Sequence, residues 1–200
     1  LYAAPQPSRF DVHGRIDLRY TDKPQNESMN VSVVRPVRVL ERGSSYQASS
    51  LMTTASAYDL RAAAAVYPDW VSNPNLYISP SVSPRVLQLG RQIVQDAAAG
   101  TPYDQARAIE SWLRQNITYN ERIPEPPEGV DPIEWLLFDK QEGYCTYYAT
   151  AMILMLRGLG VPARMAAGFT QGEWDAETGQ FVVRERDAHT WVEVYFPGYG

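Results

Sequence analysis

The chain has 200 residues, of which 44% are hydrophobic and 20% are charged, and its formal net charge is -5 at pH 7. A chain of this length and composition can bury a core unaided, which excludes the disordered and fibrous classes. One cysteine and two histidines exclude a disulfide framework and argue against a zinc site, so we expect no metal and no cofactor. Scattered basic residues and the absence of a long apolar run predict no nucleic-acid partner and no membrane span within the chain.

The first part of the chain has the pattern of strands. Residues 10–20 alternate between apolar and polar side chains, which is typical of a half-buried strand. Turn-forming residues at 22–28 separate it from a second apolar run at 31–40. Pro36 interrupts that run, so we expect an edge strand or a bulge there. A small antiparallel unit accounts for this stretch.

Helical patterns follow. Residues 57–66 are rich in alanine, and Pro68 ends the pattern. Residues 79–83 have the composition of a linker. We therefore predict two regions, a β-rich N-terminal region with a short helix at 1–78 and a core at 79–200.

Two helices of that core have clear start signals. A Ser-Pro pair at 83–84 and a Thr-Pro pair at 101–102 each combine an N-cap residue with proline at the first helical position. The first helix is expected to run to Gly100 and the second to Asn116.

A loop and a short helix come next. Residues 120–130 contain three prolines and three glutamates, a composition that predicts a surface loop. Asp131 and Pro132 then open a short helix that extends to Phe138.

Cys145 begins an apolar helical pattern. The apolar positions of this helix fall at one face: Cys145, Tyr148, Ala149, Met152, Ile153 and Leu156. A thiol is only a few per cent thiolate at pH 7, and a helix dipole contributes only about 0.3 to 1 kcal/mol, so a nucleophilic cysteine needs an imidazole nearby. A lone cysteine on an apolar face is also well explained as a small buried hydrophobe, and the pattern alone leaves both interpretations open.

Two longer segments carry a resemblance to a known family. They are Gly143-Tyr144-Cys145 with Ala149, Leu156–Arg164 and Gly168, and the later segment Asp187–Phe196. Together they resemble the core of bacterial transglutaminase-like proteins. In that family the cysteine of the first segment is the nucleophile and the histidine of the second is its base, which implies catalytic roles for Cys145 and His189. Thr190 stands where the family usually has alanine.

The resemblance implies a fold and a reaction. The fold is α+β, a papain-like, transglutaminase-like core in which helices pack on an antiparallel sheet, preceded by the small β-rich region. The reaction is cysteine-dependent acyl transfer from a protein or peptide amide through a thioester, which an amine acceptor or water resolves. Membrane-anchored relatives carry this domain on the extracytoplasmic side, which implies the same location and tethering through segments outside this chain. The alternative is a catalytically idle binding or scaffold domain of a membrane protein.

Other groups of the site are less defined. The backbone N–H of Cys145 is the expected oxyanion donor, with the Gln141 side chain as a weaker candidate. The family has an orienting aspartate about fifteen residues after the histidine, and this position falls beyond Gly200, so we expect the core to be truncated at its C-terminus. Asp187 and Glu193 are near in sequence but are predicted to lie too far from His189 to replace it. The other histidine, His13, is predicted to be structural.

Overall fold

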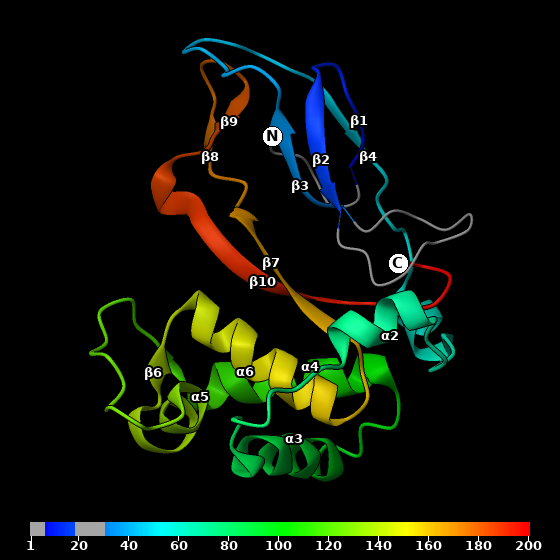
Figure 1. The fold of residues 1–200 in the computed structure, drawn as a ribbon, viewed down its shortest axis with the longest axis vertical. Coiled ribbons are helices and arrows are strands. Elements are labelled where there is room, and N and C mark those ends of the chain that lie inside the picture. Colours follow the sequence, from blue (N-terminus) through cyan, green and yellow to red (C-terminus); the bar gives the residue numbers. More distant parts are fainter. Residues whose placement is uncertain (1–6, 19–30) are drawn as a thin grey trace. The chain divides into compact units, whose positions relative to one another are not determined.

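The computed structural model describes residues 7–18 and 31–200 (Figure 1). They divide into two compact units, with the boundary between Ser56 and Ala57. The sequence predicted the boundary between residues 78 and 79, whereas the structure groups residues 57–78 with the core.

The first unit is built from antiparallel pairs. β1 (Pro7–Phe10) pairs with β4 (Ala48–Ser50), and β2 (Gly14–Leu18) pairs with β3 (Val31–Pro36). The predicted antiparallel unit is therefore confirmed. The turn-forming residues 22–28 lie outside the described part of the chain.

The predicted single strand at 10–20 is wrong, because the chain bends at Asp11. The Asp11 Oδ1 atom accepts a hydrogen bond from the Gln47 N–H at 2.7 Å, and the Asp11 N–H donates to the Gln47 carbonyl at 3.1 Å. These bonds end β1 and let β2 begin with another partner. β3 ends at Pro36, since proline cannot continue the ladder, and it does not extend to residue 40.

Two short helices explain why the second unit begins earlier than predicted. α1 (Ala57–Ala62) ends before residue 66, and Pro68 precedes an unpredicted helix, α2 (Asp69–Asn75). Arg61 of α1 pairs with Asp104 at 2.8 Å, and Val71 of α2 is buried. A helix as short as α1 is marginal by itself, so its contacts decide its extent more than its alanines do.

The remaining elements of the second unit follow in chain order. The helices are α3 (Pro84–Asp96), α4 (Pro102–Asn116), α5 (Pro132–Trp135), the π-helix η1 (Leu136–Lys140), α6 (Cys145–Gly158) and the 3-10 helix η2 (Glu185–Asp187). The strands are β5 (Thr118–Tyr119), β6 (Glu142–Gly143), β7 (Ala163–Phe169), β8 (Glu173–Asp175), β9 (Gln180–Val182) and β10 (Ala188–Val194). Both predicted N-caps are confirmed, since Ser83 accepts from the Arg85 N–H and Thr101 from the Asp104 N–H.

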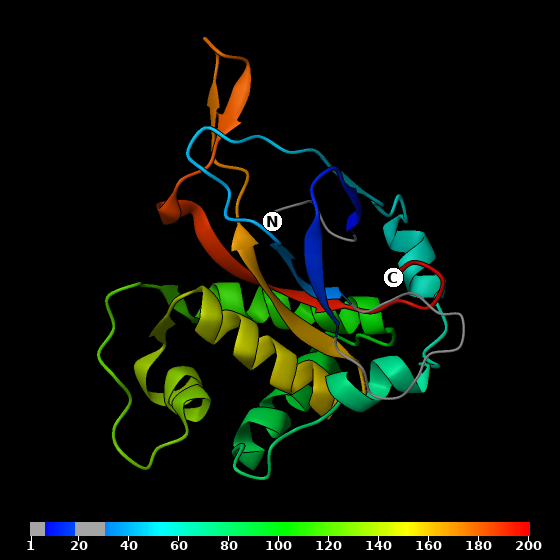
Figure 2. The ribbon, with the colours of Figure 1, turned by 45° about the horizontal axis from the view of Figure 1, so that its top comes forward.

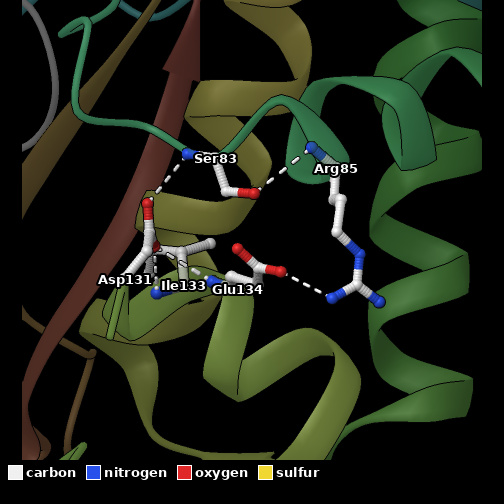
Figure 3. Close-up of polar contacts among 5 residues, drawn as sticks. All are labelled: Ser83, Arg85, Asp131, Ile133 and Glu134. Atoms are coloured by element: carbon white, nitrogen blue, oxygen red, sulfur yellow. Dashed lines mark hydrogen bonds and ion pairs between the residues drawn. The ribbon is translucent and has the colours of Figure 1, made fainter. Parts of the chain in front are cut away.

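Asp131 joins the starts of two helices (Figure 3). Its Oδ1 atom accepts hydrogen bonds from the N–H groups of Ile133 at 2.8 Å and Glu134 at 3.0 Å, which caps α5. Its Oδ2 atom accepts from the Ser83 N–H at 3.0 Å, at the start of α3. Glu134 also pairs with Arg85 at 2.5 Å, so one carboxylate cap and one ion pair hold α3 and α5 together.

Replacing Asp131 by alanine should lower the free energy of unfolding by about 1 to 3 kcal/mol, because three backbone N–H groups lose their acceptor. Urea unfolding followed by circular dichroism measures this change. Asp139→Ala is the matched control, since Asp139 is exposed and the structure gives its carboxylate no hydrogen-bond partner in the described part of the chain. Equal stability of the two variants would contradict the role of Asp131.

The second unit has a layered core with α6 at its centre. On one side α6 packs against the antiparallel pair β7 and β10, and on the other it packs against α3 and α4 (Figures 1 and 2). Adding a Cβ atom to Gly90 of α3 would bring it within 2.8 Å of the Met155 Cβ atom of α6, so the two helices approach closely there. Fully buried side chains such as Met155, Leu156 and Leu136 fill the layers, each contributing about 1.5 to 3 kcal/mol. The α+β architecture expected from the sequence is confirmed.

Candidate active site

The chain enters α6 through a tightly packed glycine. Gly143 of β6 pairs in parallel with Tyr119 of β5, and an added Cβ atom at Gly143 would lie 2.5 Å from the Leu136 Cδ1 atom. Any larger residue would have to displace the buried Leu136 side chain or the chain itself. Cys145 therefore starts α6 at a fixed place, as predicted, and its side chain is partly exposed.

The stripe predicted on α6 divides between two environments. Cys145, Tyr148, Ala149 and Met152 line a cleft, while Ile153 and Leu156 are in the hydrophobic core. Residues outside the stripe are also buried, because α6 has packed neighbours on both sides: Ala151 and Met155.

His189 lies in β10, directly opposite Gly168 of β7. Trp191 is two residues further along the same strand and shares the face of His189. A Cβ atom added at Gly168 would come within 3.0 Å of the Trp191 ring, so the indole covers the glycine across from the histidine. A side chain at position 168 would displace this ring.

Cys145 and His189 line the same cleft, which has a volume of about 760 Å³. The other lining residues come from α4 and the residue after it, β5, α6 and β10: Glu110, Leu113, Arg114, Ile117, Tyr119, Tyr148, Ala149, Met152, Thr190, Trp191 and Val192. The volume is in the range of pockets that bind small ligands or short peptide segments. The cleft is mainly apolar, with the thiol and the imidazole contributed by neighbouring elements.

Tyr119 is a cleft residue that the sequence analysis missed. The pKa of its hydroxyl is raised, and burial is the largest cause. The nearby Cys145 sulfur and a hydrogen bond to Glu121 raise this pKa further, whereas a hydrogen bond with the backbone N–H of Cys145 lowers it. The hydroxyl donates to the Glu121 carboxylate at 3.2 Å. The one proton of this hydroxyl is donated to Glu121, so the hydroxyl can act as a donor beside the thiol only by exchanging that partner.

A polar cluster fixes β5 against β6. The Asn120 N–H donates to the Gly143 carbonyl at 2.8 Å, and the Asn120 side chain donates to Glu142 at 2.6 Å. Lys140 pairs with the same carboxylate at 3.2 Å. The hydrogen bond from Asn120 and, to a smaller extent, that from Lys140 hold the pKa of Glu142 below its ordinary value. This cluster sets the position of Tyr119 relative to the start of α6.

The carboxylates near His189 in sequence have other partners. Asp187 accepts from the Arg184 N–H at 2.7 Å, and Glu193 pairs with Arg164 at 2.7 Å. In the described residues neither of them bonds to the imidazole, in agreement with the expectation that neither orients it. Gln141 does not line the cleft, and its carbonyl accepts from the Thr118 N–H at 2.8 Å. His13 is exposed in the first unit.

A papain-like α+β core with a cysteine at a helix start and a histidine on a neighbouring strand defines a class of thiol-dependent domains. The sequence profile of the transglutaminase-like superfamily matches residues 88–200, and the chain belongs to this superfamily. No helix of the described residues is long and apolar enough to cross a membrane.

Similar proteins agree with this assignment. YebA of Bacillus subtilis (strain 168) is 35% identical over 136 residues, which cover 64% of this chain. A protein-glutamine gamma-glutamyltransferase of Pseudomonas aeruginosa is 33% identical over 129 residues, which cover 63% of this chain. The matched segment makes up 18% of each of these two relatives. The crystal structure of the periplasmic domain of TgpA from Pseudomonas aeruginosa matches with a TM-score of 0.67 and 27% identity, over 98% of this chain and 64% of that domain.

Proposed function

We propose that this domain is a cysteine acyltransferase that acts on amides, with Cys145 as nucleophile and His189 as general base. The observation that carries the proposal is that the thiol and the imidazole line one cleft, although Cys145 and His189 lie 44 positions apart in the sequence. Membership of the transglutaminase-like superfamily supports the same roles.

The proposed reaction has two halves. The imidazole of His189 takes the proton of the Cys145 thiol, and the sulfur attacks the amide carbon to form a tetrahedral intermediate. The proposed donors to its oxyanion are the Cys145 N–H and the Tyr119 hydroxyl, whose proton would turn from Glu121 to the oxyanion. The C–N bond then breaks, the amine leaves with the proton from His189, and a thioester remains. An amine or a water molecule attacks that thioester and releases the thiol.

The substrate class follows from the relatives. One of them is named a protein-glutamine gamma-glutamyltransferase, so the side-chain amide of glutamine in a protein or peptide is the proposed acyl donor. An amine gives transamidation and water gives hydrolysis. Because a similar solved domain is periplasmic, we propose that this domain also acts outside the cytoplasm, tethered to a membrane through other segments of a longer protein.

The test is an assay of the purified chain with a glutaminyl peptide, with and without a labelled primary amine. We expect release of ammonia in both reactions and incorporation of label in the second. Peptide binding with no ammonia and no label would instead identify a catalytically idle binding domain.

Tyr119→Phe should lower kcat about a hundred-fold with little change in KM, because a donor that acts on the oxyanion contributes mainly in the transition state. Steady-state kinetics on the glutaminyl peptide measure both constants. Tyr148→Phe is the matched control: Tyr148 lines the same cleft, but its hydroxyl donates to a part-buried backbone carbonyl, that of Ile117, whereas the Tyr119 hydroxyl donates to an exposed side chain that it can exchange for a substrate. A loss of kcat that is equal in both variants would contradict a special role for the Tyr119 hydroxyl.

A further inference from the structure

The loop that follows β5 begins beside the thiol. β5 and β6 run parallel with Tyr119 opposite Gly143, and the Asn120 N–H donates to the Gly143 carbonyl at 2.8 Å. Paired strands lie about 4.8 Å apart, so the two chain segments leave this pair side by side. Two residues further along, one segment reaches Glu121 and the other reaches Cys145. Both views of the ribbon have this loop beside the start of α6 (Figures 1 and 2).

A side-chain contact holds the Glu121 carboxylate at this position. The Tyr119 hydroxyl donates to the Glu121 Oε1 atom at 3.2 Å, and Tyr119 lines the cleft together with Cys145. The Cys145 sulfur is close enough to the same hydroxyl to raise its pKa. Glu121 is exposed and does not itself line the cleft. Its carboxylate therefore lies just outside the cleft, near the thiol.

This carboxylate has no cationic partner in the described part of the chain. Among those residues no lysine or arginine forms an ion pair with Glu121, and its Oε2 atom accepts no hydrogen bond. Arg122 is the next residue, and its backbone N–H donates to the Asn120 side chain at 2.8 Å. Glu142, which also precedes the thiol closely, differs because it is paired with Lys140. Glu121 thus places an uncompensated negative charge near the thiol.

A primary amine that resolves a thioester arrives with a positive charge. The ammonium group of a free lysine side chain has a pKa of about 10.4, so it is protonated at neutral pH. A carboxylate is a far weaker base than an amine, so it attracts this cation but does not keep its proton. The ammonium loses one proton to water, and the neutral nitrogen attacks the thioester carbon. A C–N bond replaces the C–S bond, and a second proton passes from the nitrogen through His189 to the sulfur.

We propose that Glu121 selects the amine acceptor, drawing a primary ammonium group such as that of a lysine side chain to the thioester on Cys145. This inference rests on the proposed function and names the class of its second substrate. The acyl donor occupies the cleft, whereas Glu121 lies outside it. The acceptor therefore approaches along the loop at 120–130.

The experiment measures how one thioester divides between acceptors. The wild-type chain and Glu121→Gln each receive a glutaminyl peptide with a low concentration of a labelled pentylamine, which is a cation at neutral pH, or of a hydrazide with the same label, which is neutral. The substitution keeps a carbonyl that can accept from the Tyr119 hydroxyl and removes the charge. Label incorporated per ammonia released reports the second half-reaction alone, because both acceptors and water compete for the same thioester.

At low salt the wild-type chain should incorporate the pentylamine about two- to fivefold more than Glu121→Gln does, the scale of an exposed ion pair, and both chains should incorporate the hydrazide equally. The difference should shrink as salt rises. Glu128→Gln is the matched control, since it removes the same charge from an exposed position of the same loop, and it should behave as the wild type. An equal loss in Glu128→Gln, or no loss in Glu121→Gln, overturns the assignment.

A second measurement tests Glu121 without turnover. If the wild-type chain releases no ammonia, the proposed function fails, but the single cysteine still reacts with methanethiosulfonate reagents. The rate with the trimethylammonium-ethyl reagent, divided by the rate with the neutral methyl reagent, should be about threefold higher in the wild-type chain than in Glu121→Gln at low salt. Without peptide turnover, an equal ratio in the two chains overturns the inference.

Discussion

Replacing Cys145 by alanine should reduce ammonia release from a glutaminyl peptide at least about a thousand-fold. Without the thiol no thioester can form, so both transamidation and hydrolysis stop. Mass spectrometry of the quenched reaction should detect an acyl adduct on the wild-type chain and none on the variant. Since Cys145 is the single cysteine of the chain, an adduct on sulfur can be assigned without ambiguity.

The loss must occur without unfolding. Cys145 is only partly buried, so its replacement by alanine should change the free energy of unfolding little. The matched control is Thr150→Ala, which alters another threonine of α6, whose hydroxyl donates to the Thr146 carbonyl and which does not line the cleft. Turnover by Cys145→Ala that equals turnover by Thr150→Ala would end the case for a thiol nucleophile.

His189→Ala should lower kcat/KM by about a hundred- to ten-thousand-fold at neutral pH, because the imidazole is the proposed acceptor of the thiol proton and the proton donor to the leaving amine. The chain provides a matched control, since His13 is its other histidine and lies exposed in the first unit. His13→Ala should retain wild-type activity. Similar losses in both variants, or full activity in His189→Ala, would remove His189 from the mechanism.

The parts of the fold that local chemistry determines were predictable. Ser83 and Thr101 cap helices where the Ser-Pro and Thr-Pro pairs indicated them. Asp131 opens α5 for the same reason, since a side-chain acceptor followed by proline satisfies the first N–H groups of a helix. The end of that helix was not predictable. The Gln141 N–H donates to the Leu136 carbonyl five residues earlier, which makes the last turn a π-helix. No periodic pattern in the sequence predicts such a turn.

The cleft was only partly predictable. The family motifs identified Cys145 and His189, and the structure has both in one cleft. Tyr119 was missed because its place depends on a parallel pair of two-residue strands, which are too short for a detectable alternation. The run Ile117-Thr118-Tyr119 after the helix is the one sequence signal, since such residues favour a strand. The place of Arg114 in the cleft was not predictable either, because on α4 alone it is an ordinary surface arginine paired with Glu110.

The rate of alkylation of Cys145 by iodoacetamide, measured against pH in the wild-type chain and in His189→Ala, tests the central claim most directly. The single cysteine means that the rate reports this thiol alone. The paired arrangement predicts that at pH 6 to 7 the wild-type thiol reacts about tenfold or more faster than a free cysteine peptide, and that His189→Ala loses this advantage. A wild-type profile that coincides with that of the free peptide, and that does not change in His189→Ala, would contradict a catalytic pair.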